Sequence, residues 1–364
     1  MKVALFISGT VLVITLIIIV AGFRQKAGKN DPDYLINYLN HQKNWSLTVN
    51  RNGETLVSVR ENEMFPLASA MKTIIAIEYA KKCGEQKLDP SLSVSLEELD
   101  RYYIPNTDGG AHKDWIAYSK DKGLLLGKGT TLENVVKGML AFSSNANTDY
   151  LIDLLGMEEI NQSLDELNIE KHEALYPISG AMLIPTYLKM KDPSYTNDYI
   201  ETKVKEMSKE EYIRIAQIVS QQLKEGGKGQ YLENEHSSKR LDKIWSDRLT
   251  RSTTFEYATL MGKLNSKTFF QRETQVRLDA VMEGIMENPV NQEWLKHAGQ
   301  KGGSTEFLVT HAAYATDREG NSTEVALFTN ELERGESEKI SGSLNSFMLK
   351  ILRDEDFRNK LKEL

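Results

Sequence analysis

Strand-like runs at the two ends of the chain constrain its fold more than any other feature. Residues 45–49 and 55–59 flank an Asn-Gly pair at 52–53, which is typical of a β-hairpin. Near the C-terminus, residues 307–316 and 323–330 flank a second turn at 317–320. Because an isolated hairpin is only marginally stable, we expect the two pairs to share one antiparallel sheet.

The segment between these pairs has helical periodicity. Apolar residues recur at helical spacing over 132–140 and 208–224, and Thr130 and Glu133 predict a capping box before the first of these helices. A short helix is expected at 91–99, irregular structure at 176–185, and a strand beginning at Lys301. The chain is therefore predicted to be an α+β protein: an antiparallel sheet built from N- and C-terminal strands and flanked by helices, with an inserted all-helical lobe over about 85–295.

An uncharged apolar stretch precedes the folded part. It runs from Val3 to Phe23, and about 20 apolar residues suffice to cross a bilayer as a helix. We expect residues 1–26 to be an uncleaved transmembrane signal-anchor, with a cleaved secretory signal as the alternative. Residues 27–43 are then a linker with a short helix, and residues 44–364 form the main domain.

Composition and residue spacing argue against nucleic-acid binding, an internal disulfide and a metal site. The chain has 364 residues, a formal net charge of −7 and no long basic stripe, which argues against nucleic acid as a partner. Its single cysteine, Cys83, cannot form an internal disulfide. No two histidines have metal-ligand spacing, so we expect no metal and no other cofactor, and interpret all six as structural or surface residues. They are His41, His112, His172, His236, His297 and His311.

A serine and a lysine lie three residues apart where a proline-containing turn leads into an apolar helical run. The stretch is FPLASAMKTIIA at 65–76, which places Ser69 near the first turn and Lys72 on the same helix face. Unpaired N–H groups at a helix start create a positive potential that stabilises an oxyanion. Lys72 can take the hydroxyl proton once burial or nearby cations lower its pKa. The stretch therefore predicts Ser69 as a nucleophile and Lys72 as its base.

Two later stretches add polar groups to the predicted cleft. Ser143 and Asn145 lie in a short connection between two predicted helices, where a tight turn would aim both side chains to one side. Ser143 can pass a proton to a leaving nitrogen, and Asn145 can bind a substrate amide.

The second stretch, KGGST at 301–305, carries the charge of Lys301 and a pair of glycines that lets a ligand approach the backbone. The N–H group of Ser304 can complete an oxyanion hole with that of Ser69. Gly303, Ser304 and Thr305 are expected to line the substrate.

Together, the three stretches resemble the three motifs of the penicillin-binding protein and serine β-lactamase superfamily. The resemblance covers roughly residue 45 to the C-terminus, and residues 253–264 are similar to the helix before the third motif in class A β-lactamases. It implies an acyl-enzyme mechanism in which Ser69 attacks a β-lactam or peptide carbonyl, Lys72 is the base, directly or through water, and Ser143 relays the proton. Asn145 and Lys301 would hold the substrate amide and carboxylate.

The sequence departs from these motifs at three places. Gly302 stands where the family usually has Thr or Ser, so a hydroxyl that contacts the substrate carboxylate is missing unless Ser304 or Thr305 replaces it. Ser144 stands where class A enzymes usually carry Asp. These enzymes also carry a deacylating Glu on a loop after the second motif. Glu173 is the candidate by position, with a solvated loop carboxylate as the alternative; without such a group a β-lactam adduct would hydrolyse slowly.

These features predict a membrane-anchored serine hydrolase with an extracytoplasmic catalytic domain and β-lactamase-type activity. One alternative is a D-Ala-D-Ala carboxypeptidase or penicillin-binding protein that acts on cell-wall peptides. Another is a non-catalytic, membrane-anchored sensor on the same fold, which Gly302 and Ser144 would suit. The expected partners are a small-molecule or peptidoglycan-peptide substrate and, through the N-terminal helix, the membrane. The motifs do not separate a β-lactam, a D-alanyl peptide and an ester as the natural substrate.

Overall fold

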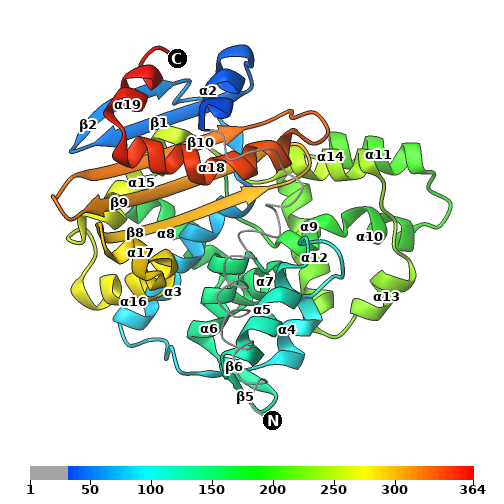
Figure 1. The fold of residues 1–364 in the computed structure, drawn as a ribbon. Coiled ribbons are helices and arrows are strands. Elements are labelled where there is room, and N and C mark those ends of the chain that lie inside the picture. Colours follow the sequence, from blue (N-terminus) through cyan, green and yellow to red (C-terminus); the bar gives the residue numbers. More distant parts are fainter. Residues whose placement is uncertain (1–31) are drawn as a thin grey trace, which may run out of the picture.

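The computed structural model describes residues 32–364, and a five-stranded antiparallel sheet joins the two ends of that range (Figure 1). The first strand pairs with the last along its whole length, from Trp45 opposite Thr329 to Arg51 opposite Thr323. This pairing confirms that the terminal hairpins share one sheet. Across the sheet the strands are β2 (Glu54–Val59), β1 (Trp45–Arg51), β10 (Ser322–Thr329), β9 (Val309–Asp317) and β8 (Leu295–Ser304).

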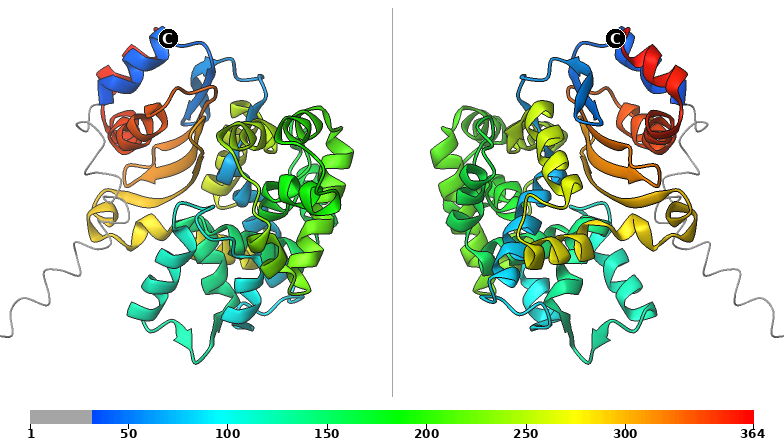
Figure 2. Two further views of the ribbon diagram at one scale, coloured as in Figure 1. Left: turned by 90° about the vertical axis from the view of Figure 1, so that its right-hand side faces the viewer. Right: turned by 90° about the vertical axis from the view of Figure 1, so that its left-hand side faces the viewer.

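Helices cover both faces of this sheet (Figure 2). One face packs against the helices near the two ends of the described chain, and Leu47 of β1 shares a buried cluster with Leu35 and Phe347. These helices are α2 (Pro32–His41), α18 (Glu336–Arg353) and α19 (Glu355–Leu361). The other face packs against α15 (Thr254–Ser266), and α16 (Arg272–Met282), η3 (Gly284–Glu287) and α17 (Pro289–Gln292) contact β8.

The central helix α3 (Lys72–Gly84) lies between the sheet and the helical lobe. Residues 72–80 of this helix are all buried, and its isoleucines share one core with Phe328 of the sheet and Val135 of the lobe. Each such side chain stabilises the fold by roughly 1.5–3 kcal/mol on burial. The short 3₁₀ helix η1 (Ala68–Met71) precedes α3, so the start of α3 is fixed at the junction of sheet and lobe.

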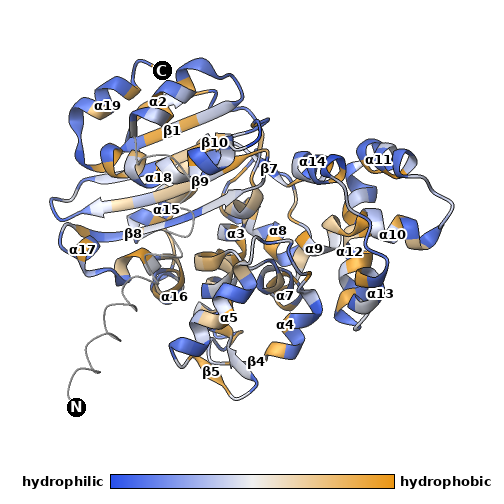
Figure 3. Ribbon diagram, turned by 45° about the vertical axis from the view of Figure 1, so that its right-hand side comes forward, coloured by the Kyte–Doolittle hydropathy of each residue, from blue (hydrophilic) through white to orange (hydrophobic). Residues whose placement is uncertain are grey.

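The lobe consists of short helices in two groups. The first group packs around α3 and contains α4 (Leu96–Tyr102), α5 (Ala111–Asp121), α6 (Leu132–Lys137), the π-helical turn η2 (Gly138–Phe142), α7 (Asn145–Leu155) and α8 (Met157–Glu166). The second has its own core around Tyr212 and contains α9 (Ile178–Met182), α10 (Ile184–Lys191), α11 (Asn197–Glu206), α12 (Lys209–Lys224), α13 (Lys228–Glu233) and α14 (Lys239–Arg248). In Figure 3 the outer helices α11 and α14 are mostly hydrophilic, whereas α9 and α12 carry hydrophobic stretches.

Two small sheets complete the fold. β3 (Phe65–Pro66) pairs with β7 (Arg251–Ser252), which ties the segment before η1 to the segment before α15. A three-stranded sheet of β4 (Ser93–Ser95), β6 (Gly129–Thr131) and β5 (Leu125–Leu126) lies at the end of the first group of helices.

Several local predictions are wrong. The helix expected at 91–99 begins only at Leu96, because residues 93–95 form β4. The cap of α6 is Thr131, whose hydroxyl accepts from the amide of Asn134, so no Thr130–Glu133 box forms. The segment 176–185 is not irregular but contains α9 and the start of α10.

Two further differences concern the sheet. β8 starts at Leu295, so Lys301 lies near the end of the strand rather than at its beginning. The region 85–295 is not one helical body either, because α15 packs against β9 and β10.

The predicted signal-anchor at residues 1–26 lies outside the described residues. Within residues 32–364, no helix has the length and apolar composition required to span a bilayer.

Candidate active site

Ser69 lies on the short helix that connects the sheet to α3. The backbone of Ala68, just before it, has a φ of +42°, which turns the chain sharply from β3 into η1. The Ser69 side chain is partly exposed, whereas Ala70 and Met71 are buried. The turn therefore presents one hydroxyl to solvent at the start of a helix whose first nine residues are buried.

Gly303 of β8 stands directly against Ser69. A Cβ built on Gly303 would lie 2.2 Å from the amide nitrogen of Ser69 and 2.9 Å from the Cβ of Ala68. Only glycine allows β8 to come this close to η1. The close approach brings the end of the third motif beside the candidate nucleophile.

Lys72 is buried between the first two motifs. Its Nζ donates to the carbonyl oxygen of Ser143 at 2.7 Å and to Oδ1 of Asn145 at 2.9 Å. Burial, followed by repulsion from Lys301, holds the Lys72 pKa well below its usual range, and Asp149 and Asp108 oppose this shift. The low pKa favours a neutral amine, whose two N–H groups can make these bonds and leave the lone pair to accept a proton.

Ser143 adopts an unusual backbone conformation that brings the second motif against Lys72. It has a φ of +74° and follows the π-helical turn η2. Ser144 then caps α7, and its buried Oγ also contacts His112 Nδ1 at 2.9 Å. The serine that stands in place of Asp is therefore part of the support of this turn.

Lys301 reaches the same turn from the sheet. Its side chain is buried, and Nζ donates to Oγ of Ser143 at 2.8 Å and to the carbonyl oxygen of Gly302 at 2.9 Å. Burial lowers the pKa of Lys301 to about 7. Two amines of lowered pKa thus contact one serine residue, Lys72 at its carbonyl and Lys301 at its hydroxyl.

Two predicted site residues, Glu173 and Thr305, make their contacts outside the site. The carboxylate of Glu173 accepts from Lys209 Nζ at 2.7 Å and from the amide of Arg251 at 3.1 Å, and it makes no hydrogen bond to Ser69 or Lys72. The Thr305 hydroxyl contacts Ser246 Oγ at 2.8 Å and accepts from the amide of Phe307. Ser304 is exposed at the end of β8.

Two buried titratable residues near the lysines belong to none of the three sequence motifs. Asp149 on α7 accepts from the amides of Ile178 and Ser179 at 2.8 and 2.7 Å, which anchors the start of α9. Burial raises the Asp149 pKa to about 6. The other residue, His311, is paired with Gly302 on the neighbouring strand. A buried carboxylate or imidazole has no sequence signature that separates it from a surface one, so only the structure reveals them.

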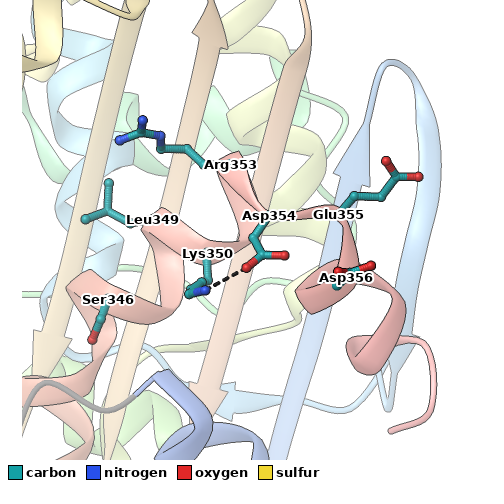
Figure 4. Close-up of a pocket in the computed structure, with 7 residues that line it drawn as sticks. All are labelled: Ser346, Leu349, Lys350, Arg353, Asp354, Glu355 and Asp356. Carbon is teal, nitrogen blue, oxygen red and sulfur yellow. Dashed lines mark hydrogen bonds and ion pairs between the residues drawn. The ribbon is translucent and has the colours of Figure 1, made fainter.

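A surface hollow elsewhere on the molecule is a poor candidate for the site. It lies between α18 and α19 (Figure 4), where Lys350 donates to Asp354 at 2.6 Å. Helix α18 packs on the sheet face opposite to α3, so the hollow is on the far side of the sheet from Ser69. It is lined by Ser346, Leu349, Lys350, Arg353, Asp354, Glu355 and Asp356.

Comparison with known proteins gives the family of the chain. A sequence profile of the beta-lactamase enzyme family matches residues 33–284. The chain belongs to this family. The match includes residues 69–72 and 143–145 and ends before β8, so it does not extend to residues 301–305.

Solved structures share the β-lactamase fold at low sequence identity. A class A beta-lactamase from Bacteroides cellulosilyticus DSM 14838 is 14% identical over 93% of this chain and 100% of its own, with a TM-score of 0.53. A beta-lactamase from Sphaerobacter thermophilus DSM 20745 is 17% identical over 92% of this chain and 96% of its own, also with a TM-score of 0.53. A structure described as PBP-A is 15% identical over 88% of this chain and 94% of its own, with a TM-score of 0.50. A comparison with curated protein sequences found no match.

Proposed function

We propose that this member of the beta-lactamase family is a serine hydrolase that is acylated on Ser69 by a β-lactam or by the D-alanyl peptide that a β-lactam resembles. The burial of Lys72 between Ser143 and Asn145 is the observation that carries the proposal. A lysine with two polar acceptors and a pKa well below its usual range is suited to remove a proton from a hydroxyl one helical turn away.

The proposed reaction moves one proton from the nucleophile to the leaving group. Lys72 accepts the proton of Ser69 as Oγ attacks the carbonyl carbon, and the amides of Ser69 and Ser304 stabilise the oxyanion. When the C–N bond breaks, Ser143 Oγ gives its proton to the leaving nitrogen and recovers one from Lys72. Asn145 orients the acyl side, and Lys301 attracts the leaving-group side.

Hydrolysis of the acyl-enzyme is the step that separates the two classes of activity. The ion pair of Glu173 with Lys209 occupies the carboxylate that we had expected to activate water. This favours slow deacylation, as in a penicillin-binding enzyme that processes cell-wall peptides. Rapid β-lactam hydrolysis is the second candidate, and the family match favours it. A non-catalytic sensor would not need two desolvated lysines at one serine, because burying amines costs stability.

We also propose that the catalytic domain lies outside the cell membrane, where cell-wall peptides are found. The apolar stretch from Val3 to Phe23 would anchor it there, or would direct secretion if cleaved. Fractionation of cells that express the full chain, followed by external protease treatment, tests both possibilities.

Intact mass spectrometry of the full-length protein mixed with benzylpenicillin tests the proposed chemistry, with Ser69→Ala as the control. We expect an adduct in the native protein alone that persists for hours. An adduct that disappears while penicillin is consumed would indicate a β-lactamase. An unmodified native protein would contradict the proposal.

A further inference from the structure

His311 and Gly302 face each other across the two strands at the edge of the sheet. They are paired residues of β9 and β8. A Cβ built on Gly302 would lie 3.2 Å from Nδ1 of His311 and 3.0 Å from the carbonyl oxygen of Thr310, closer than ordinary contact. The imidazole therefore fills the space that a side chain at position 302 would need.

The His311 ring is buried, yet one of its nitrogens has no partner. The residue is 8% exposed, and Nε2 makes no hydrogen bond to any part of the described chain. Burial, followed by the charge of Lys301, lowers the His311 pKa to about 4, so the ring is neutral at pH 7 with a single N–H. Because a buried N–H is costlier to leave unpaired than an acceptor, we assign the proton to Nδ1, which faces Gly302, and not to the unpartnered Nε2.

Lys301 brings a second donor to the same edge. Neighbouring residues of a strand point to opposite faces of the sheet, so the Lys301 side chain starts on the face opposite to Gly302. Because β8 is an edge strand, this side chain can fold back, and its ammonium group donates to the carbonyl oxygen of Gly302. Its other hydrogen bond goes to Ser143 Oγ, so one of the three N–H groups of the charged form remains. A leaving group that lies along β8 beside Gly302 would therefore meet one N–H group of His311 and one of Lys301.

We propose that His311 is a substrate-binding residue whose Nδ1–H donates, over Gly302, to a carbonyl oxygen of the leaving group. The assignment rests on the proposed acylation of Ser69. A neutral imidazole does not require a negative charge on its acceptor. The site therefore takes acyl donors whose leaving group carries an amide or ester carbonyl, as in a peptide that continues past the cleaved bond, as well as donors that end in a free carboxylate.

Acylation rates with benzylpenicillin and with its methyl ester, measured by intact mass on the full chain, test this assignment. At pH 8.5, where Lys301 is largely neutral, we expect the native protein to react with the two at rates within about 5-fold, since neutral hydrogen bonds discriminate little between the acid and the ester. His311→Ala should slow both by about 10-fold, and His311→Asn, which keeps an N–H donor, should slow them less. His311→Arg should favour the free acid by at least about 10-fold, because a fixed cation pairs with a carboxylate.

A second pair of variants separates binding by His311 from a general loss of structure. Gly302→Ala should slow acylation by displacing the ring, and its effect should be smaller in the His311→Ala background, where only the carbonyl oxygen of Thr310 still crowds the added methyl. Gly229→Ala is the matched control, because a Cβ there has no neighbour within 4 Å. Thermal unfolding of each variant shows whether the fold is kept.

Two results would overturn the assignment: a native preference for the free acid above about 100-fold, or a His311→Ala protein that reacts with both probes at the native rate. A native protein that reacts with neither probe would contradict the proposed function instead. In that case the ¹⁵N resonances of His311 in the presence of N-acetyl-D-alanine amide decide: a shift supports binding at this ring, and unchanged resonances overturn it.

Discussion

The amide nitrogen of Ser69 lies where a side chain on Gly303 would have to stand, since a Cβ there would be only 2.2 Å away. Strand β8 and helix η1 are thus in contact at backbone level. Gly303→Ala should force them apart, and a displacement of about 1 Å at a reacting centre can lower the rate by about 100-fold. We expect that loss in the acylation rate, with a decrease of about 1–3 kcal/mol in the free energy of unfolding.

The control for this prediction is Gly229→Ala. The added methyl has no neighbour within 4 Å, and the stability of helix α13 should increase slightly. Native acylation by Gly303→Ala would mean that the close approach of β8 to Ser69 has no role in the reaction.

Lys72 should contribute to activity at the expense of stability. A lysine whose folded-state pKa lies below its unfolded value of about 10.4 destabilises the fold increasingly as the pH falls from that value. Lys72→Met should abolish acylation and raise the free energy of unfolding at pH 7 by about 1–2 kcal/mol. The gain should vanish above about pH 11, where the lysine is neutral in both the folded and the unfolded state. Urea titrations at the two pH values measure it.

Lys113→Met is the matched control, because Lys113 is exposed on α5 and its replacement should change stability by less than about 0.5 kcal/mol. A Lys72→Met protein that is less stable than the native one at pH 7 would show that the two hydrogen bonds of the amine outweigh its desolvation.

The charge of Lys301 should make the preference for anionic substrates depend on pH. Its pKa of about 7 means that the ammonium is present below pH 7 and is lost as the pH rises through that value. The ratio of the acylation rates with benzylpenicillin and its methyl ester should therefore fall between pH 6 and pH 8.5. The titration of Asp149 and Lys72 changes the acylation rates of both substrates alike, so its effect cancels in the ratio. A constant ratio would exclude Lys301 as the titrating group that attracts the carboxylate.

Glu173 should be dispensable for hydrolysis of the adduct. Its carboxylate is paired with Lys209, and both side chains are about a third exposed, so Glu173→Gln should cost no more than about 1 kcal/mol of stability. We expect the lifetime of the benzylpenicillin adduct to change by less than about 2-fold, because Glu173 takes no part in the hydrolysis of the adduct. An adduct that lives at least 10 times longer in the variant would identify Glu173 as the deacylating base.

The sequence predicted those parts of the molecule that depend on local pattern. Alternation around Asn52-Gly53 located the first hairpin, and the marginal stability of hairpins led to the shared sheet. Motif spacing brought Ser69, Lys72, Ser143, Asn145 and Lys301 to one place, and the contacts among the last four agree with it.

The rest depends on contacts between residues far apart in the chain. Glu173 is held by Lys209, 36 residues away, and the Thr305 hydroxyl by Ser246, 59 residues away. No periodicity or spacing reveals such pairs. The position of His311 beside Gly302 likewise follows from the register of β8 and β9, which was predicted only approximately because the start of β8 was placed six residues too late.

The pairing of β1 with β10 also bears on when during synthesis the protein becomes competent. A chain still emerging from the ribosome would already contain Ser69 and Lys72, but it would lack Lys301 and the strands β8 to β10 that complete the sheet. Contacts between strands as far apart in the sequence as β1 and β10 form slowly, because the long segment that separates them must first close into a loop. Unfinished chains should therefore remain unreactive toward penicillin, and only molecules that have been made almost to their last helix would carry the acyl group.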